Sequence, residues 1–119
     1  MNLERHRRAI ERLYTDRVTV YRYEKIKNPV TKETELVLNT VYVDQPCRLS
    51  QRTLAANGQT EAENIIQYET KLFIAPELEI WQGDMLEVAR GNVTRRYTAG
   101  EPFVYPTHQE ISIQRKDWA

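Results

Sequence analysis

The sequence predicts an all-β fold: a small β-barrel or sandwich of six to eight short antiparallel strands with a short N-terminal helix. The apolar residues are mostly Val, Ile, Leu and Tyr, which favour strands. From residue 17 onward, apolar and polar side chains alternate with the period of two that is typical of half-buried strands. Turn signals recur about every 8–12 residues, as they do in small barrels and sandwiches.

Residues 1–15 are the best helix candidate and are expected to form a separate N-terminal arm. Four apolar side chains fall along one narrow helical stripe: Leu3, Ile10, Leu13 and Tyr14. Most of the basic side chains lie off that stripe: Arg5, Arg7, Arg8 and Arg12. A helix this short is marginal unless something packs on it. It either caps one end of the sheet or docks on a partner, and the sequence leaves both interpretations open.

Residues 16–119 are predicted to form one barrel domain. A strand beginning near Arg17 is expected to pair with residues 35–43 through a turn started by Asn28-Pro29. Asp44-Gln45-Pro46 is expected to end the second strand, because proline lacks a ladder donor. A third, short strand is then predicted at residues 47–51.

The segment from Thr53 to Asn64 differs from its surroundings, because it is small, polar and free of β-branched runs. A loop of this length inside a compact domain is usually functional or disordered. Residues 65–74 follow with the cleanest alternation in the chain. The further strands are predicted at residues 85–88, 93–98, 103–105 and 110–114. The turns between them are predicted at residues 82–84, 90–92 and 99–102.

The chain carries 17 basic and 17 acidic residues, so its formal net charge is zero. This balance argues against a strongly basic nucleic-acid-binding protein and against an acidic tail protein. The charges are nevertheless segregated. Residues 1–52 have a net charge of +4, residues 53–89 of −6 and residues 90–119 of +2. These blocks are candidates for complementary faces between subunits.

No residues form a recognisable catalytic, metal-binding or cofactor-binding motif, so we expect neither enzymatic activity nor a cofactor. The single Cys47 excludes an intramolecular disulfide and a cysteine zinc cluster, and it fits a reducing, intracellular setting. His6 and His108 lie at opposite ends of the chain. No apolar run approaches the ~20 residues needed to cross a bilayer, so no membrane association is expected.

Binding of single-stranded nucleic acid is an alternative, because small barrels use exposed aromatic residues beside basic ones for this purpose. Two groups of residues could supply such a patch: Tyr21, Arg22, Tyr23 and Lys25, and Arg95, Arg96 and Tyr97. The zero net charge and the acidic middle block favour the interpretation that these arginines are simply solvated. By elimination, the residues favour an interaction or assembly protein.

The order of motifs resembles the head–tail joining proteins of tailed bacteriophages. The chain opens its first strand with Asp16-Arg17-Val18-Thr19-Val20 and later carries Gly83-Asp84-Met85-Leu86-Glu87-Val88. It is most similar to the head-closure, or stopper, branch found in siphophage and myophage-type particles and in defective prophages of Gram-positive bacteria. The resemblance covers essentially the whole chain.

This resemblance implies a subunit that forms a dodecameric ring beneath the portal and adaptor. Weak pairwise contacts would be multiplied by ring closure, so a monomeric isolated subunit is compatible with such a ring. The ring would close the DNA channel after packaging and offer a docking surface to the tail. Its partners would be copies of itself, portal–adaptor proteins and tail proteins, with packaged DNA nearby but not bound by sequence. It would assemble in the host bacterial cytoplasm and reside in the particle neck. A tail-completion role in the same particle is the alternative.

Two sets of residues follow as candidates for these roles. The channel-facing loop, by position, contains Ala56, Asn57, Gly58, Gln59, Thr60, Glu61 and Glu63. Its acidic residues would repel DNA phosphates. The candidates for docking partners are charged residues of the three blocks: Arg5, Arg8, Arg12, Glu77, Glu79, Arg95 and Arg96.

Overall fold

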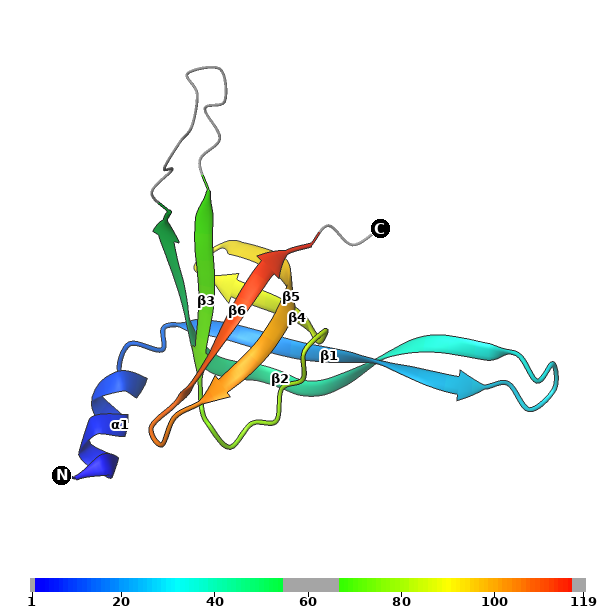
Figure 1. The fold of residues 1–119 in the computed structure, drawn as a ribbon, viewed down its shortest axis with the longest axis horizontal. Coiled ribbons are helices and arrows are strands. Elements are labelled where there is room, and N and C mark those ends of the chain that lie inside the picture. The colour runs from blue at the N-terminus through cyan, green and yellow to red at the C-terminus, as the bar shows by residue number, and fades with distance from the viewer. Residues whose placement is uncertain (1, 55–66, 117–119) are drawn as a thin grey trace, which may run out of the picture.

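The computed structural model describes residues 2–54 and 67–116 and confirms the all-β class. Over these residues it has one helix and six strands (Figure 1). They are α1 (Leu3–Glu11), β1 (Asp16–Lys27), β2 (Thr34–Thr53), β3 (Tyr68–Ile74), β4 (Met85–Arg90), β5 (Val93–Val104) and β6 (Gln109–Arg115). The strands close into an antiparallel barrel in the order β1-β2-β3-β6-β5-β4. Of the two predicted architectures, the barrel is therefore the one observed.

The core is built from the inward-facing side of the predicted alternation. Side chains two residues apart on a strand point to the same face, so each strand sends a short apolar series into the barrel. The fully buried members are Val18, Val20, Cys47, Leu72, Ile74, Leu86, Val88 and Ile111. The predicted inward orientation of Ile111 and Ile113 on the last strand is confirmed.

The predicted break at residues 44–46 is wrong, because β2 runs unbroken from Thr34 to Thr53. The irregularity that the sequence signals is a bulge within the strand. Val18 pairs with Gln45 but Val20 pairs with Tyr42, and Asp44 has a φ of 50°. Pro46 is tolerated because β3 pairs with β2 only from Cys47 onward, so Pro46 has a strand neighbour on one side alone.

The predicted turn at residues 99–102 is also wrong, since β5 continues through it. Ala99 pairs with Ile113 and Pro102 with Ile111, so an extra residue is accommodated as a further bulge, in β5. Gly100 is required there, because a Cβ atom at this position would lie 2.7 Å from the Ser112 carbonyl oxygen. Gly and Pro therefore mark a bend in a long strand here, and not its end.

A two-stranded hairpin, residues 22–40, projects from the barrel as an arm (Figure 1). Pairing of β1 with β4 stops at Tyr21, and pairing of β2 with β3 starts at Cys47. The strands of this hairpin arm therefore pair only with each other among the described residues. The predicted turn at Asn28 is confirmed: its side-chain oxygen accepts from the Val30 amide at 2.9 Å.

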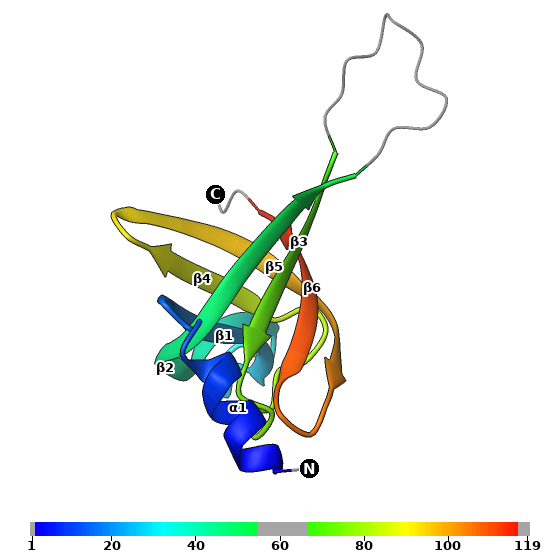
Figure 2. The ribbon, with the colours of Figure 1, turned by 90° about the vertical axis from the view of Figure 1, so that its left-hand side faces the viewer.

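The two ends of the barrel are different. The link between β3 and β4, residues 75–84, covers one end, and the Gln109 amide donates to the carbonyl oxygens of Ala75 and Leu78 at 2.8 and 2.6 Å. At the other end the β2–β3 and β4–β5 hairpins diverge, as Figure 2 shows. Helix α1 lies beside the barrel and has no buried residue.

Candidate functional site

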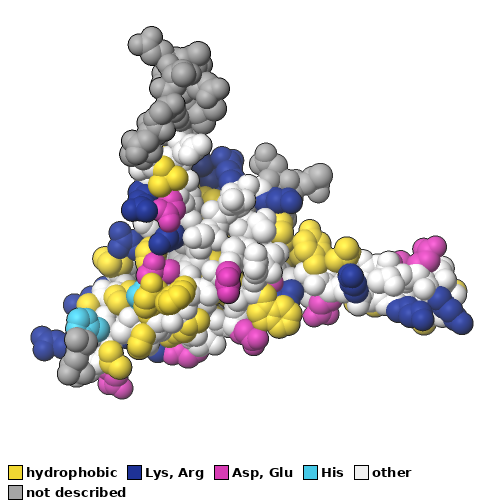
Figure 3. Space-filling view, in the orientation of Figure 1, with side chains coloured by type: hydrophobic (Ala, Val, Ile, Leu, Met, Phe, Trp, Pro, Cys, Tyr) yellow, Lys and Arg dark blue, Asp and Glu magenta, His cyan; other side chains and the backbone are white. Residues whose placement is uncertain are grey.

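The hairpin arm carries an apolar stripe on one face. Direct cross-strand partners share a face, and the register places Tyr23 opposite Leu38 and Lys25 opposite Leu36. The stripe consists of Tyr21, Tyr23, Leu36 and Leu38. Tyr23 is 51% exposed and Leu36 65% exposed. Figure 3 shows both basic and acidic side chains over the outer part of the arm, so charged groups of both signs surround the apolar stripe.

The opposite face of the arm is more polar. Arg22, Glu24 and Ile26 alternate along β1 on this face. Asn39, opposite Arg22, donates from its side chain to the Glu24 carboxylate at 2.7 Å. The two faces therefore differ in the kind of partner that they could bind.

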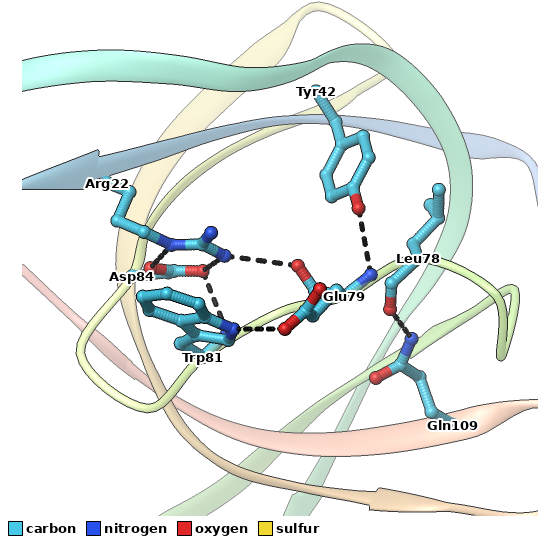
Figure 4. A network of polar contacts seen from close by, with 7 residues as sticks. All are labelled: Arg22, Tyr42, Leu78, Glu79, Trp81, Asp84 and Gln109. Atoms are coloured by element: carbon cyan, nitrogen blue, oxygen red, sulfur yellow. Dashed lines mark hydrogen bonds and ion pairs between the residues drawn. The ribbon is translucent and has the colours of Figure 1, made fainter.

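The root of the arm is tied to the β3–β4 link by a network of polar contacts (Figure 4). The guanidinium of Arg22 donates to both carboxylate oxygens of Asp84, at 2.9 and 2.8 Å. It also lies 3.8 Å from the centroid of the Trp81 ring. Asp84 is 2% exposed and accepts in addition from the Trp81 amide at 2.8 Å. Hydrogen bonding to Asp84 raises the pKa of Arg22. This network fixes where the arm leaves the barrel.

Glu79 extends the network to β2. Its backbone amide donates to the Tyr42 hydroxyl at 2.9 Å, and its carboxylate accepts from the Trp81 indole at 2.8 Å. The Arg22 guanidinium reaches the Glu79 carbonyl oxygen at 3.1 Å. Glu79, predicted as a partner-docking residue, thus helps to hold the link within its own subunit.

The two motifs that carry the family resemblance have structural roles. Asp16 is buried, and its carboxylate accepts from the Leu49 amide at 2.8 Å, which fixes the start of β1 against β2. Gly83 has a φ of +93°, a left-handed conformation that glycine adopts without strain. It turns the chain so that Asp84 meets Arg22. Neither motif forms a catalytic arrangement.

Helix α1 is held to the barrel chiefly by one ion pair. Arg7 donates through both terminal nitrogens to the two oxygens of Glu77, one at 2.7 Å, and also to Glu11 at 2.6 Å. The hydrogen bond from Arg7 lowers the pKa of Glu77. Tyr14 follows the helix, and burial raises the pKa of its hydroxyl to about 12. At least one of the charge pairs expected between the basic and acidic blocks of different subunits therefore forms within a single chain.

The predicted docking residues fall into three groups. Arg5 and Arg8 on α1 and Arg12 at its C-terminal cap are exposed, away from the Arg7 anchor. Glu77 and Glu79 already have partners in the same chain. Arg95 and Arg96 are not brought together, because successive strand residues point to opposite faces. Their roles in docking stay predictions.

The predicted channel loop lies almost entirely outside the described residues, since Ala56, Asn57, Gly58, Gln59, Thr60, Glu61 and Glu63 belong to the segment 55–66. The structure describes the residues on either side of this segment. Thr53 pairs with Tyr68 and the Leu54 amide donates to the Gln67 carbonyl oxygen at 2.8 Å. The segment therefore connects the two strands of the β2–β3 hairpin.

The described residues form no arrangement with evident catalytic chemistry. Burial raises the pKa of Cys47 to about 12, so its thiol stays protonated at neutral pH. His108 contacts Thr107 and Glu110 at 2.9 and 3.0 Å, with Glu110 also 3.5 Å from Lys71. Over residues 2–54 and 67–116, no three His, Cys, Asp or Glu side chains are grouped to hold a metal ion.

The two sequence patches considered for nucleic-acid binding are only partly assembled: Tyr21, Tyr23 and Lys25 share one face of the hairpin arm, but the remaining members are dispersed. Arg22 is committed to Asp84, and the Tyr97 ring is buried in the barrel. Arg96 lies 3.3 Å from Glu87, which leaves that arginine beside a carboxylate. Within the described part of the chain, the one helix, α1, is too short and too polar to cross a membrane.

Sequence reasoning missed the hairpin arm and the contacts at its root. The alternation at Tyr21 and Tyr23 showed which side chains share a face, but not that the pair of strands leaves the barrel. For residues 82–84 the sequence predicted a turn and no contact with the arm. The pairing of Arg22 with Asp84 spans 62 residues and has no local sequence signal.

Comparisons with known proteins give one structural likeness to report. No family model matches the chain, and no curated protein matches it. Among solved structures, it is similar to the phage-like element PBSX protein xkdH from Bacillus subtilis. The TM-score is 0.49 and the sequence identity 14%, over 84% of this chain and 92% of that chain.

Proposed function

We propose that this chain is a structural subunit of the head–tail connector of a tailed phage or prophage particle, in the head-closure position. Copies would form a ring beneath the portal–adaptor, close the DNA channel and present a surface to the tail. The observation that carries the assembly role is the projecting hairpin arm with its exposed apolar stripe. The family resemblance of the motifs supplies the particular particle and position.

The arm is better suited to a neighbour than to solvent. An isolated two-stranded hairpin is only marginally stable in water, and its outer edges offer unpaired backbone groups to another chain. The stripe adds apolar area that a second surface would cover. Because the arm lies on one side of the barrel, its docking site on the next copy is a different surface. Such head-to-tail contacts generate a ring when the rotation closes.

Helix α1 supplies a second projecting element. The Arg7–Glu77 contact holds the helix against the β3–β4 link and leaves Arg5, Arg8 and Arg12 exposed. We infer that these arginines meet an acidic surface of the adaptor. Weak single contacts would suffice, because ring formation multiplies them. The free subunit would then be monomeric.

Channel closure belongs to the loop between β2 and β3, residues 53–64, in this proposal. The pairing of the flanking residues supports it, because Thr53 and Tyr68 are the last described pair of the β2–β3 hairpin. Packaged DNA would lie nearby without sequence-specific binding. The proposal includes no enzymatic activity, cofactor or membrane, and it locates the chain in the host cytoplasm during assembly and in the particle neck afterwards.

The test is assembly with the portal and adaptor proteins of the same phage or prophage. Tyr23→Asp and Leu36→Asp each place a carboxylate on the apolar stripe, and we expect both to abolish rings in electron micrographs and to cause loss of DNA from filled heads. Ile26→Asp is the matched control, because Ile26 is 45% exposed on the opposite face of the same arm. All three should keep the stability of the native chain within about 0.5 kcal/mol.

The outcomes separate the candidate functions. Equal effects of the stripe and control variants would refute the arm as the ring contact. Assembly with tail tubes and not with portals would establish the tail-completion alternative. Salt-dependent affinity for single strands, with no assembly, would establish nucleic-acid binding instead.

A further inference from the structure

The open end of the barrel, between the β2–β3 and β4–β5 hairpins, forms a mouth with a cavity of 680 Å³. Leu49, Val88 and Tyr97 line its inner part. Arg90, Arg95 and Arg115 line it as well, each from a different strand. The volume lies within the range of roughly 300–1,000 Å³ that is typical of ligand sites.

The three arginines occupy positions that point into the barrel. On each strand they continue the inward series by steps of two, beyond the last core side chain. The series are Leu86, Val88 and Arg90 on β4; Ala99, Tyr97 and Arg95 on β5; and Ile111, Ile113 and Arg115 on β6. The alternation thus persists to the end of each strand while the inward residue changes from apolar to cationic.

This concentration of positive charge is only partly balanced. Arg90 donates to the Leu49 carbonyl oxygen at 3.2 Å and lies 3.9 Å from the Asp16 carboxylate. Arg95 and Arg115 contact no carboxylate among the residues that the structure describes. Like charges held close together repel one another, so an anionic occupant would relieve this repulsion.

We infer that the mouth binds an acidic peptide segment of a partner protein, with an apolar side chain on the inner surface and carboxylates on the arginines. Arginine pairs with carboxylates through two parallel hydrogen bonds, which suits this role. The apolar inner lining requires an apolar group that a bare phosphate or carboxylate does not supply.

A nucleic-acid strand fits the mouth less well. Its backbone would need a basic track leading out of the cavity, but two of the arginines on the outer faces of the same hairpins are already beside carboxylates. Arg52 lies 2.5 Å from Glu69, and Arg96 lies 3.3 Å from Glu87. Of the two tyrosines in the lining, Tyr97 is buried and offers no free face for base stacking, which leaves Tyr68, 53% exposed, as the one aromatic ring that a base could reach there.

Fluorescence anisotropy on the full chain tests the inference with the labelled peptide Glu-Phe-Glu-Leu-Glu-Glu. We expect saturable binding that weakens about tenfold in Arg95→Gln and in Arg115→Gln, since each loses a charged hydrogen bond. Arg48→Gln is the control, because Arg48 is an exposed arginine on the outward face of β2 and should leave binding unchanged. Replacing Phe with Ser in the peptide should also weaken binding.

Charge reversal gives a second readout. Arg95→Glu should transfer preference to the peptide Lys-Phe-Lys-Leu-Lys-Lys, provided that its melting temperature shows a folded chain. Absence of peptide binding, an equal loss in Arg48→Gln, or tighter binding of labelled oligothymidylate at the arginines would each overturn the inference. The test uses the isolated chain and leaves the hairpin arm intact, so its failure is independent of ring assembly.

Discussion

Asp84→Asn should be among the most damaging single substitutions outside the apolar core. The carboxylate accepts two hydrogen bonds from Arg22, at 2.9 and 2.8 Å, and one from the Trp81 amide at 2.8 Å. An asparagine of the same size loses the charge and turns donors toward the donors of Arg22. The substitution therefore leaves the charge of Arg22 without its carboxylate, and the remaining contacts of the guanidinium are the Glu79 carbonyl oxygen, the Trp81 ring and at most one amide oxygen.

The size of the expected loss in the free energy of unfolding follows from the burial of the Asp84–Arg22 ion pair. Removing one partner of a buried ion pair costs ~3–5 kcal/mol. The Asp84 side chain is 2% exposed, but the Arg22 side chain retains 15% exposure and can recover some hydration. We therefore expect a loss near the lower end, about 3 kcal/mol, which for a chain of this size lowers the melting temperature by roughly 10 °C.

Urea unfolding followed by tryptophan fluorescence measures this loss, because Trp81 itself belongs to the network. Glu79→Gln is the control: its carboxylate contacts the exposed Trp81 indole, so we expect a loss below about 1 kcal/mol. In the double variant Arg22→Ala/Asp84→Ala the losses should not add, with a coupling of about 1–3 kcal/mol. A loss below about 1 kcal/mol for Asp84→Asn, or additive losses, would refute the role assigned to this network.

Three further predictions follow from the barrel. Gly100→Ala should destabilise by ~1–3 kcal/mol in urea unfolding, because its Cβ would lie 2.7 Å from the Ser112 carbonyl oxygen. Hydrogen bonding from His108 lowers the pKa of Glu110 below its ordinary value of 4.5. The contribution of Glu110 to the free energy of unfolding is therefore complete above about pH 4.5 and is lost as pH falls through the lower folded-state pKa. Glu110→Gln should flatten that part of the curve of stability against pH. The Cys47 thiol, its pKa raised to about 12 by burial, should resist iodoacetamide at pH 8 until the chain unfolds.

Each of these has a control and an outcome that contradicts it. Gly91 has open space around it, so Gly91→Asn should cost less than Gly100→Ala; the reverse order would contradict the steric explanation. Glu101→Gln, which changes an exposed carboxylate, should leave the acid limb of the curve in place. Rapid alkylation of folded Cys47 would contradict its burial.

Local periodicity was sufficient to predict the class and most of the core. The inward positions on β3 and β6, such as Leu72 and Ile111, follow from alternation alone. The hairpin turns at Asn28 and Gly91 follow from the conformations that these residues favour. The inward positions and the hairpin turns depend on residues that are close together in the sequence, so local sequence patterns are enough to predict them.

Strand continuity was not predictable in the same way. Pro46 and Gly100 both suggested ends, but each lies at or beside a bulge in a longer strand. Whether such a residue ends a strand depends on which neighbours it has across the sheet. The cross-strand neighbours of a residue are set by the tertiary fold, and the strand propensity of the residue does not specify them.

The candidate site was predicted least well, because its contacts join distant segments. Arg7 pairs with Glu77 and Arg22 with Asp84, so the basic N-terminal block meets the acidic middle block inside the subunit. The charge segregation was correctly recognised, but its intramolecular use was not. The inward arginines of the mouth became visible only once the register was known.

The most direct test of the proposed connector role is electron cryomicroscopy of DNA-filled heads assembled with this chain and the portal and adaptor proteins of the same particle. We predict a ring of copies beneath the adaptor in which residues 22–40 of each copy lie on the next, covering Tyr23 and Leu36. No density for the chain at the neck would contradict the proposed function. A ring in which every arm faces solvent would contradict the proposed contact.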